Sequence, residues 1–275
     1  MLKRYGSALR IGLSKTGVAV VRTSGWKQTR SVVVAEFDVA ADEGGSHEAV
    51  LTQLGVLLKD AQCSRLPVRI VLSDSWVRRW MVIPPQNAAS LADCQAAAAA
   101  RFQALFGEPM SGWNMAADWD AARPFLACAI PRALLAGLQQ IARDRDLVLL
   151  EVAPQFVVAW NRWRANLQEG AWFGVLHRQV LTLAVVGRNG PQATREVELP
   201  IDALRDQQRV PAILAREALR LNVPMPQEIR LCGQIPAHWA MQQTGKVSFV
   251  RLDRSRSAHA PLSAGAALAL TGMPS

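Results

Sequence analysis

One order of predicted elements occurs twice along this chain of 275 residues. In each half, three alternating or apolar runs predict strands, a stretch with apolar residues at helical spacing predicts a helix, and a further apolar run predicts a buried strand. The first copy is predicted at Leu9 to Leu13, Val18 to Arg22, Ser31 to Val39, His47 to Ala61 and Val68 to Leu72. The second is predicted at Trp172 to His177, Val180 to Val186, Thr194 to Leu199, Asp202 to Leu221 and Glu228 to Cys232. This repeat restricts the chain to an α/β fold with two similar halves.

Three strands, a helix and a buried strand are the order of a ribonuclease H-like sheet. We therefore expect two such lobes, each a mixed sheet flanked by helices, spanning residues 1–169 and 170–275. A strand from Val247 to Arg251 and a helix from Leu262 to Thr271 are expected to complete the second lobe.

Extra elements interrupt the first copy. The alternating run Trp76 to Ile83 ends at two prolines, and Ser90 with Asp93 predicts the N-cap of a helix that ends near Phe106. Two alternating segments follow, Gly112 to Asp118 and Pro124 to Ile130, and then a helix that begins at Pro131. We expect a small αββα insertion at about residues 86–146, followed by a strand from Val148 and a helix from Pro154.

Composition excludes several classes of protein. The formal charge is +9, but the basic residues are dispersed and lack interleaved aromatic residues, so no nucleic-acid partner is expected. The four cysteines form no C-x-x-C pair and the four histidines have no metal-ligand spacing, so no metal is expected. No apolar run reaches the ~18 residues of a membrane span. We expect a cytoplasmic chain without membrane insertion.

Five stretches give the chain a resemblance to a known group of proteins: "IGLSKTGVAVV", "WVRRWMVIPP", "ARPFLACAIPRALLAGLQQIARDRDLVLLEVAPQFVVAWNRW", "EIRLCGQIP" and "SAGAALAL". In this order they resemble the actin-like (ASKHA) superfamily, which includes sugar kinases and heat-shock chaperones. Within it, they are similar to the PilM family of type IV pilus assembly and the related cytoplasmic domains of the GspL family of type II secretion. The resemblance implies the actin-like fold of two ribonuclease H-like lobes.

The nucleotide-binding turns that the resemblance implies are degenerate here. Actin-like ATPases carry an Asp in each of two phosphate turns and a glycine cluster beside the adenosine. Here the first turn is Ser14, Lys15, Thr16 and Gly17, the second is Leu176-His177-Arg178-Gln179, and the adenosine turn retains only Gly233. We expect no cofactor and a pseudo-ATPase. A weak anion site at Lys15 is the alternative to a simple glycine-assisted turn.

The positions of two carboxylates suggest a nuclease as an alternative function. Asp74 and Glu151 lie at predicted strand ends, where ribonuclease H-like nucleases place metal ligands. A two-metal nuclease also needs a carboxylate on the first strand, and that strand has none. We therefore interpret Asp74 and Glu151 as helix-capping or solvated groups.

A partner-binding surface is predicted at one strand. Trp76, Arg78 and Trp80 are two residues apart, so on a strand their side chains would line one face with aromatic and cationic groups. Arg79 adds a second positive charge. Packing of the tryptophans in the core is the open alternative.

These observations favour a non-catalytic scaffold that is peripheral to the inner membrane. The resemblance implies a place in a type IV pilus or type II secretion platform. There the chain would bind the cytoplasmic tail of a bitopic, PilN-like membrane protein, alongside other platform components. An active ATPase or phosphotransferase of the same fold is the alternative hypothesis, and a nucleic-acid-binding ribonuclease H-like protein is a more distant one.

Overall fold

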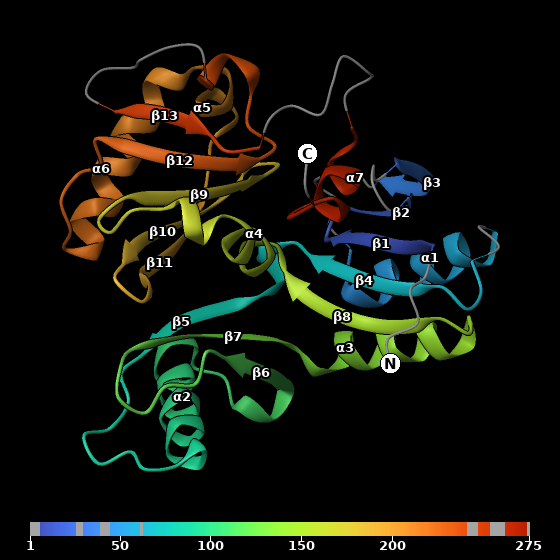
Figure 1. Cartoon of the computed structure of the whole chain (residues 1–275), viewed down its shortest axis with the longest axis horizontal. Helices are drawn as coiled ribbons and strands as arrows, with labels where there is room; N and C mark the ends of the chain where they lie inside the picture. Colours follow the sequence, from blue (N-terminus) through green and yellow to red (C-terminus); the bar gives the residue numbers. More distant parts are fainter. Residues whose placement is uncertain are drawn as a thin grey trace. The chain divides into compact units, whose positions relative to one another are not determined.

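The computed structural model describes residues 6–25, 30–38, 45–60, 63–240, 247–253 and 262–273 (Figure 1). The chain divides into two compact units. The first consists of Met1–Val77, Ile130–Ala159 and Ser257–Pro274, and the second consists of Arg78–Ala129 and Trp160–Arg256. Each unit therefore combines segments that are distant in the sequence.

The first unit is built on a five-stranded sheet of order β3-β2-β1-β4-β8. Its strands are β1 (Ser7–Ser14), β2 (Gly17–Ser24), β3 (Arg30–Asp38), β4 (Pro67–Leu72) and β8 (Val148–Pro154). Strands β1, β2 and β3 are antiparallel, and β4 and β8 run parallel to β1. This is the expected ribonuclease H-like order, so the prediction for the first copy is confirmed.

Helices cover this sheet. Helices α1 (His47–Asp60) and α3 (Arg132–Asp144) contact each other, and α7 (Ala264–Ala269) packs on β1 and β2 (Figure 1). A Cβ at Gly137 of α3 would meet the end of the Leu51 side chain of α1, so the two helices pack closely at this glycine. Leu134 and Leu138 are the buried face of α3.

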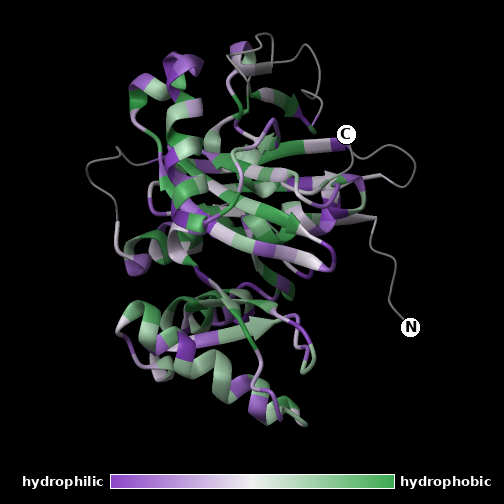
Figure 2. Cartoon of the chain, turned by 90° about the vertical axis from the view of Figure 1, so that its left-hand side faces the viewer, coloured by the Kyte–Doolittle hydropathy of each residue, from purple (hydrophilic) through white to green (hydrophobic). Residues whose placement is uncertain are grey.

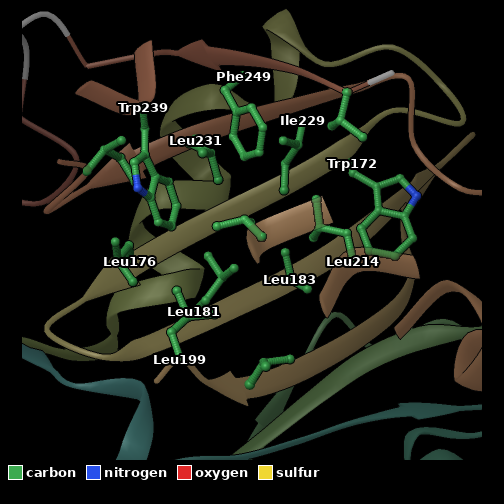
Figure 3. Packing of buried hydrophobic residues seen from close by; sticks show 14 of the residues in the cluster. Trp172, Leu176, Leu181, Leu183, Leu199, Leu214, Ile229, Leu231, Trp239 and Phe249 are labelled. Atoms are coloured by element: carbon green, nitrogen blue, oxygen red, sulfur yellow. The ribbon is translucent and has the colours of Figure 1, made fainter. Parts of the chain in front are cut away.

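The second unit repeats the architecture with a sheet of order β11-β10-β9-β12-β13. Its strands are β9 (Trp172–His177), β10 (Val180–Gly187), β11 (Gly190–Glu198), β12 (Glu228–Gly233) and β13 (Ser248–Arg251). Apolar side chains from alternate positions of these strands form the core with Leu214 and Trp239 (Figure 3). The strands are mostly hydrophobic, whereas the helices carry both kinds of residue (Figure 2).

The helix predicted from Asp202 to Leu221 is interrupted. The structure has α5 (Ile201–Arg205), the 3-10 turn η5 (Gln207–Arg209) and α6 (Val210–Leu221). The Asp206 carboxylate accepts the backbone N–H of Gln208, and Pro211 lies in the first turn of α6, where a missing N–H costs nothing. Both residues favour the start of a new helix at this point. The apolar spacing continues across the break, so the pattern alone predicts one long helix.

The insertion differs in extent from the prediction. It is a three-stranded sheet of order β5-β7-β6, formed by β5 (Arg78–Val82), β6 (Trp113–Ala117) and β7 (Phe125–Pro131), with α2 (Leu91–Phe106) packed on β5. Ser90 is the expected N-cap of α2, and it forms a capping box with Asp93. The insertion therefore starts eight residues earlier than expected and lacks α3, whose apolar face belongs to the first unit.

The two compact units group the segments differently from the predicted lobes of residues 1–169 and 170–275, whose boundary stays a prediction. The insertion clusters with the second sheet, and α7 packs on the first sheet rather than the second. Both differences depend on contacts between segments that are far apart in the chain.

Candidate functional site

The first degenerate turn joins β1 to β2 and is closed by its own side chains. The Ser14 hydroxyl donates to the Gly17 carbonyl at 3.2 Å and lies 3.4 Å from the Thr16 hydroxyl, while Lys15 points into solvent. A Cβ at Gly17 would collide with the Asp38 carboxylate at the end of β3. The turn is a glycine-assisted hairpin, and the carboxylate beside it comes from another strand, which sequence spacing could not reveal.

The second turn, between β9 and β10, presents a buried imidazole. His177 is 3% exposed, and within the described chain neither ring nitrogen has a hydrogen-bond partner. Burial, reinforced by the charge of Arg178, lowers the pKa of His177 from 6.5 to about 4. The side chain is therefore neutral at pH 7, where an ATPase of this fold would need a carboxylate.

The remnant of the adenosine turn packs against that hairpin. Gly233 has a φ of 93°, its N–H donates to the Asp253 carboxylate at 2.8 Å, and a Cβ there would collide with the Leu176 carbonyl. The Gln234 side chain accepts the N–H of Arg178 at 2.8 Å. Glycine is required at 233 by this close contact and positive φ.

Asp74 and Glu151 have the structural roles expected of them. Asp74 is buried and its carboxylate accepts the N–H of Phe156 at 3.1 Å, so it caps α4 (Gln155–Trp163). Glu151 is exposed and lies 3.5 Å from Arg69. Within the described residues, no group of three or more His, Cys, Asp or Glu side chains could hold a metal ion.

Strand β5 has two distinct faces. Arg78 and Trp80 point toward α2, as their shared parity predicts, but Trp76 lies in the preceding 3-10 turn η2 (Asp74–Trp76) rather than on the strand. Trp76 is also buried. The predicted row of three residues is therefore shortened to two.

Trp80 is part of the insertion's core. It is 2% exposed, its ring lies 5.1 Å from that of Phe102, and its Nε1 donates to the Ala98 carbonyl at 3.2 Å. Arg78 is 44% exposed at the edge of the same cluster, with its guanidinium 5.3 Å from the Phe106 ring. Of this pair only Arg78 reaches the surface, where its guanidinium also pairs with the Glu108 carboxylate at 3.4 Å.

Arg79 lies on the opposite face of β5 and joins the insertion to the second sheet. Its guanidinium is 4% exposed and contacts the Glu196 carboxylate of β11 at 3.0 Å and the Thr182 hydroxyl of β10 at 3.3 Å. A charged side chain this buried is held by its partners. Sequence reasoning could not identify Glu196, which follows 117 residues later.

A cavity of about 830 Å³, here called the insert groove, lies within the second unit beside this contact. Met81, Ile83 and Trp119 line it from the insertion, and Arg164, Arg188 and Pro191 line it from the second lobe. Its size is in the range of ligand pockets. No local sequence pattern predicts this cavity, because its walls come from four separate segments of the chain.

The fold defined by these two sheets is the actin-like ATPase fold, and solved structures share it over most of the chain. A chain of a PilM–PilN type IV pilus biogenesis complex is 14% identical with a TM-score of 0.61, covering 90% of this chain and 88% of that one. The cytoplasmic domain of EpsL, an inner-membrane component of the type II secretion system of Vibrio cholerae, is 12% identical with a TM-score of 0.57, covering 96% and 92%.

A third similar structure is a Bacteroides thetaiotaomicron protein of unknown function with an actin-like ATPase fold. It is 12% identical with a TM-score of 0.58, covering 91% of this chain and 93% of that one. No protein-family profile matches the chain, and no curated protein matches its sequence. At these identities the likeness establishes the fold, as the sequence resemblance implied.

None of the helices that the structure describes is both long and apolar enough to cross a membrane.

Proposed function

We propose that this chain is a non-catalytic scaffold at the cytoplasmic face of an inner-membrane type IV pilus or type II secretion platform. It binds the cytoplasmic tail of a bitopic, PilN-like membrane protein. The observation that carries this proposal is the near full-length structural similarity to PilM, taken from a complex with PilN, and to the EpsL cytoplasmic domain.

The local chemistry of the turns supports a role without catalysis. The hydroxyl groups of the first turn are hydrogen-bonded within the turn, and the second turn offers a neutral imidazole. Neither turn itself carries the carboxylate that would position a metal-bound nucleotide. A protein with these turns would act by binding.

The segment that carries Trp76, Arg78, Arg79 and Trp80 is the proposed docking strand. β5 is an edge of its sheet, with β7 as its ladder partner in the described chain, so an extended tail can pair with its backbone. Arg78 attracts an acidic tail. The buried Trp76, Arg79 and Trp80 act indirectly, because they hold the strand in place.

Chemical cross-linking of the tagged full chain in membranes of its source organism, followed by mass spectrometry, tests this function. The expected result is cross-links between the insertion and a short cytoplasmic tail of a bitopic inner-membrane protein. Arg78→Glu should reduce this capture, whereas Arg65→Glu, at an exposed arginine paired with Asp146, should not. Recovery of soluble proteins alone, or magnesium-dependent ATP hydrolysis by the purified chain, would contradict the proposal.

A further inference from the structure

We propose that a group of three arginines on α6 and β11 is a contact site for the anionic headgroups of a phospholipid membrane. The group, here called the arginine cluster, consists of Arg195, Arg216 and Arg220, which surround Glu217. The inference rests on the proposed function, which brings the chain close to the inner membrane, and it adds an attachment that does not depend on the protein partner. The site lies within the second unit.

The arginine cluster carries more positive charge than its carboxylate compensates. Glu217 is fully buried, and its carboxylate contacts Nε of Arg195 at 3.1 Å, Nε of Arg216 at 3.3 Å and Nη1 of Arg220 at 2.8 Å. Within the described residues, all ion pairs of these three arginines go to Glu217. Three positive charges therefore share one negative charge, and such a local excess attracts anions.

The nearby carboxylates belong to other arginines or to the other face of the sheet. Glu196 and Glu198 alternate with Arg195 along β11, so their side chains lie on the opposite face of the strand, where Glu196 binds Arg79. Asp202 and Asp206, which precede α6, pair with Arg209. The excess charge of the cluster is thus not cancelled by these neighbours.

The guanidinium groups of the cluster retain N–H donors for a further ligand. A guanidinium has five N–H groups, and in the part of the chain that the structure describes each of these arginines bonds only to Glu217. The three side chains are between 41% and 56% exposed. The planar fork of N–H groups fits two oxygens of a phosphate, and Glu217 holds the guanidinium groups in place beforehand.

An exposed apolar side chain lies beside the cluster. Arg216, Leu219 and Arg220 have i, i+3 and i+4 spacing in α6, so they are neighbours on the surface of the helix. Leu219 is 83% exposed, more than any other large apolar side chain in the described chain. A membrane surface suits both kinds of group, because its phosphates meet the guanidinium groups while its acyl boundary takes up the leucine. A dissolved phosphate or a nucleic-acid backbone offers nothing to the leucine.

Sedimentation of the purified full chain with lipid vesicles tests this inference. The probe vesicles contain equal parts of phosphatidylethanolamine and phosphatidylglycerol, and vesicles of phosphatidylcholine alone are the neutral control. The chain should sediment with the anionic vesicles and stay in solution with the neutral ones. Added salt should release it, because salt screens exposed charges.

Glu217→Gln should strengthen binding, because it removes the negative charge at the centre of the cluster. One additional positive charge near an anionic surface should raise the vesicle affinity about fivefold. If the arginines only stabilise the fold, this variant should lose stability without gaining vesicle affinity. Circular dichroism of each variant confirms that it is folded.

Removal of all charges of the cluster should have the opposite effect. The variant that combines Glu217→Gln with Arg195→Gln, Arg216→Gln and Arg220→Gln leaves no unpaired buried charge. Its vesicle affinity should fall about tenfold or more. The matched control, Arg205→Gln with Arg209→Gln, removes the same net charge from exposed arginines of α5 and η5 and should change the affinity little.

Leu219→Ser tests the apolar contact. It should weaken binding to the anionic vesicles several-fold, because the leucine no longer enters the acyl boundary. Ile201→Ser is the control, since Ile201 is an exposed isoleucine of α5 in the same unit but outside the cluster. It should leave the vesicle affinity unchanged.

The outcomes separate this inference from the proposed function. If the wild-type chain does not sediment with anionic vesicles, or if the folded four-residue variant binds them equally well, the lipid assignment is overturned while the scaffold function stands. Tighter binding of a DNA duplex than of vesicles through the same arginines would also overturn it. Failure of the cross-linking experiment together with cluster-dependent vesicle binding would contradict the scaffold function and support the lipid site.

Discussion

At the scale of single residues, the charged side chains of this protein mostly hold its elements together. Glu217 of α6 is fully buried, and its carboxylate contacts Arg195, Arg216 and Arg220 at 3.1, 3.3 and 2.8 Å. Arg79 binds Glu196 in the same manner. Several of the dispersed arginines are therefore engaged in ion pairs that connect elements of the second unit.

Truncation of Trp80 should lower the stability of the protein much more than truncation of Arg78. Trp80→Ala removes a buried indole from the insertion core, so we expect about 3–5 kcal/mol lower stability. Arg78→Ala loses an exposed ion pair and a cation–π contact, worth less than about 1 kcal/mol. Urea denaturation of both variants measures the difference. An unchanged midpoint for Trp80→Ala would mean that the tryptophan is free for a partner, as the sequence allowed.

His177 should make the second unit acid-sensitive. Because its pKa is about 4 in the folded protein and 6.5 in the unfolded chain, the unfolded state binds the proton first as pH falls. The stabilisation is complete above pH 6.5 and is lost as pH falls toward 4, by about 3 kcal/mol in total.

Denaturant unfolding of the wild type and of His177→Phe at several pH values between 7 and 4 measures this loss. The variant should have a shallower dependence on pH. His238→Gln, at an exposed position of the same unit, controls for the removal of one histidine. Identical slopes for the wild type and His177→Phe would contradict the assignment.

At the scale of elements, the contact of α7 with the first sheet depends on missing side chains. A Cβ at Gly12 of β1 would collide with the backbone of Gly265 and Ala269 in α7. Gly265 in turn lies against Ala19 of β2. Arg10 completes the contact by donating to the carbonyls of Ala269 and Thr271 at 2.7 and 2.8 Å. Small residues let this short helix approach the sheet backbone.

Gly12→Ala should separate α7 from the sheet. Because the added methyl group meets backbone atoms that cannot rotate away, we expect about 1–3 kcal/mol lower stability and faster hydrogen exchange in β1 and α7. Gly55→Ala is the matched control in α1, where the new methyl group meets nothing within 4 Å. It should raise stability by about 0.5–1 kcal/mol. Equal effects of the two substitutions would exclude close packing as the cause.

At the scale of the whole molecule, two copies of one sheet topology are assembled from interleaved segments. The first unit takes its sheet from both sides of the insertion and its helix α7 from the end of the described chain. The fold is that of actin-like ATPases, but the turns that would hold a nucleotide in that fold carry other residues here. The conserved architecture therefore does not by itself imply the activity.

ATP with magnesium should not bind with useful affinity. The turn sequences Ser14 to Gly17 and Leu176 to Gln179 lack a carboxylate, and His177 is neutral at pH 7. Isothermal titration calorimetry at millimolar nucleotide should give no saturable heat. A saturable signal that disappears in Lys15→Glu would mean that the first turn is a phosphate site after all.

Local signals in the sequence predicted individual elements well. Period-2 and period-3.6 apolar patterns predicted the strands of both five-stranded sheets, and Ser90 with Asp93 predicted the start of α2. Asp74 was expected as a capping or solvated group, and it is a capping group. A helix cap depends on residues that are close in the chain. A strand or helix with one buried face has apolar residues at a regular spacing, so both kinds of feature can be recognised in the sequence.

Only the tertiary structure decided what covers each face. The periodicity of β5 places Arg78 and Trp80 together, but it cannot say that α2 buries Trp80 or that Glu196 binds Arg79 on the other side. The assignment of α3 and α7 to the first unit and the walls of the insert groove depend in the same way on distant segments. The position of a residue along a strand determines on which face its side chain lies. Which residue contacts that side chain depends on packing between distant segments, which no local pattern encodes.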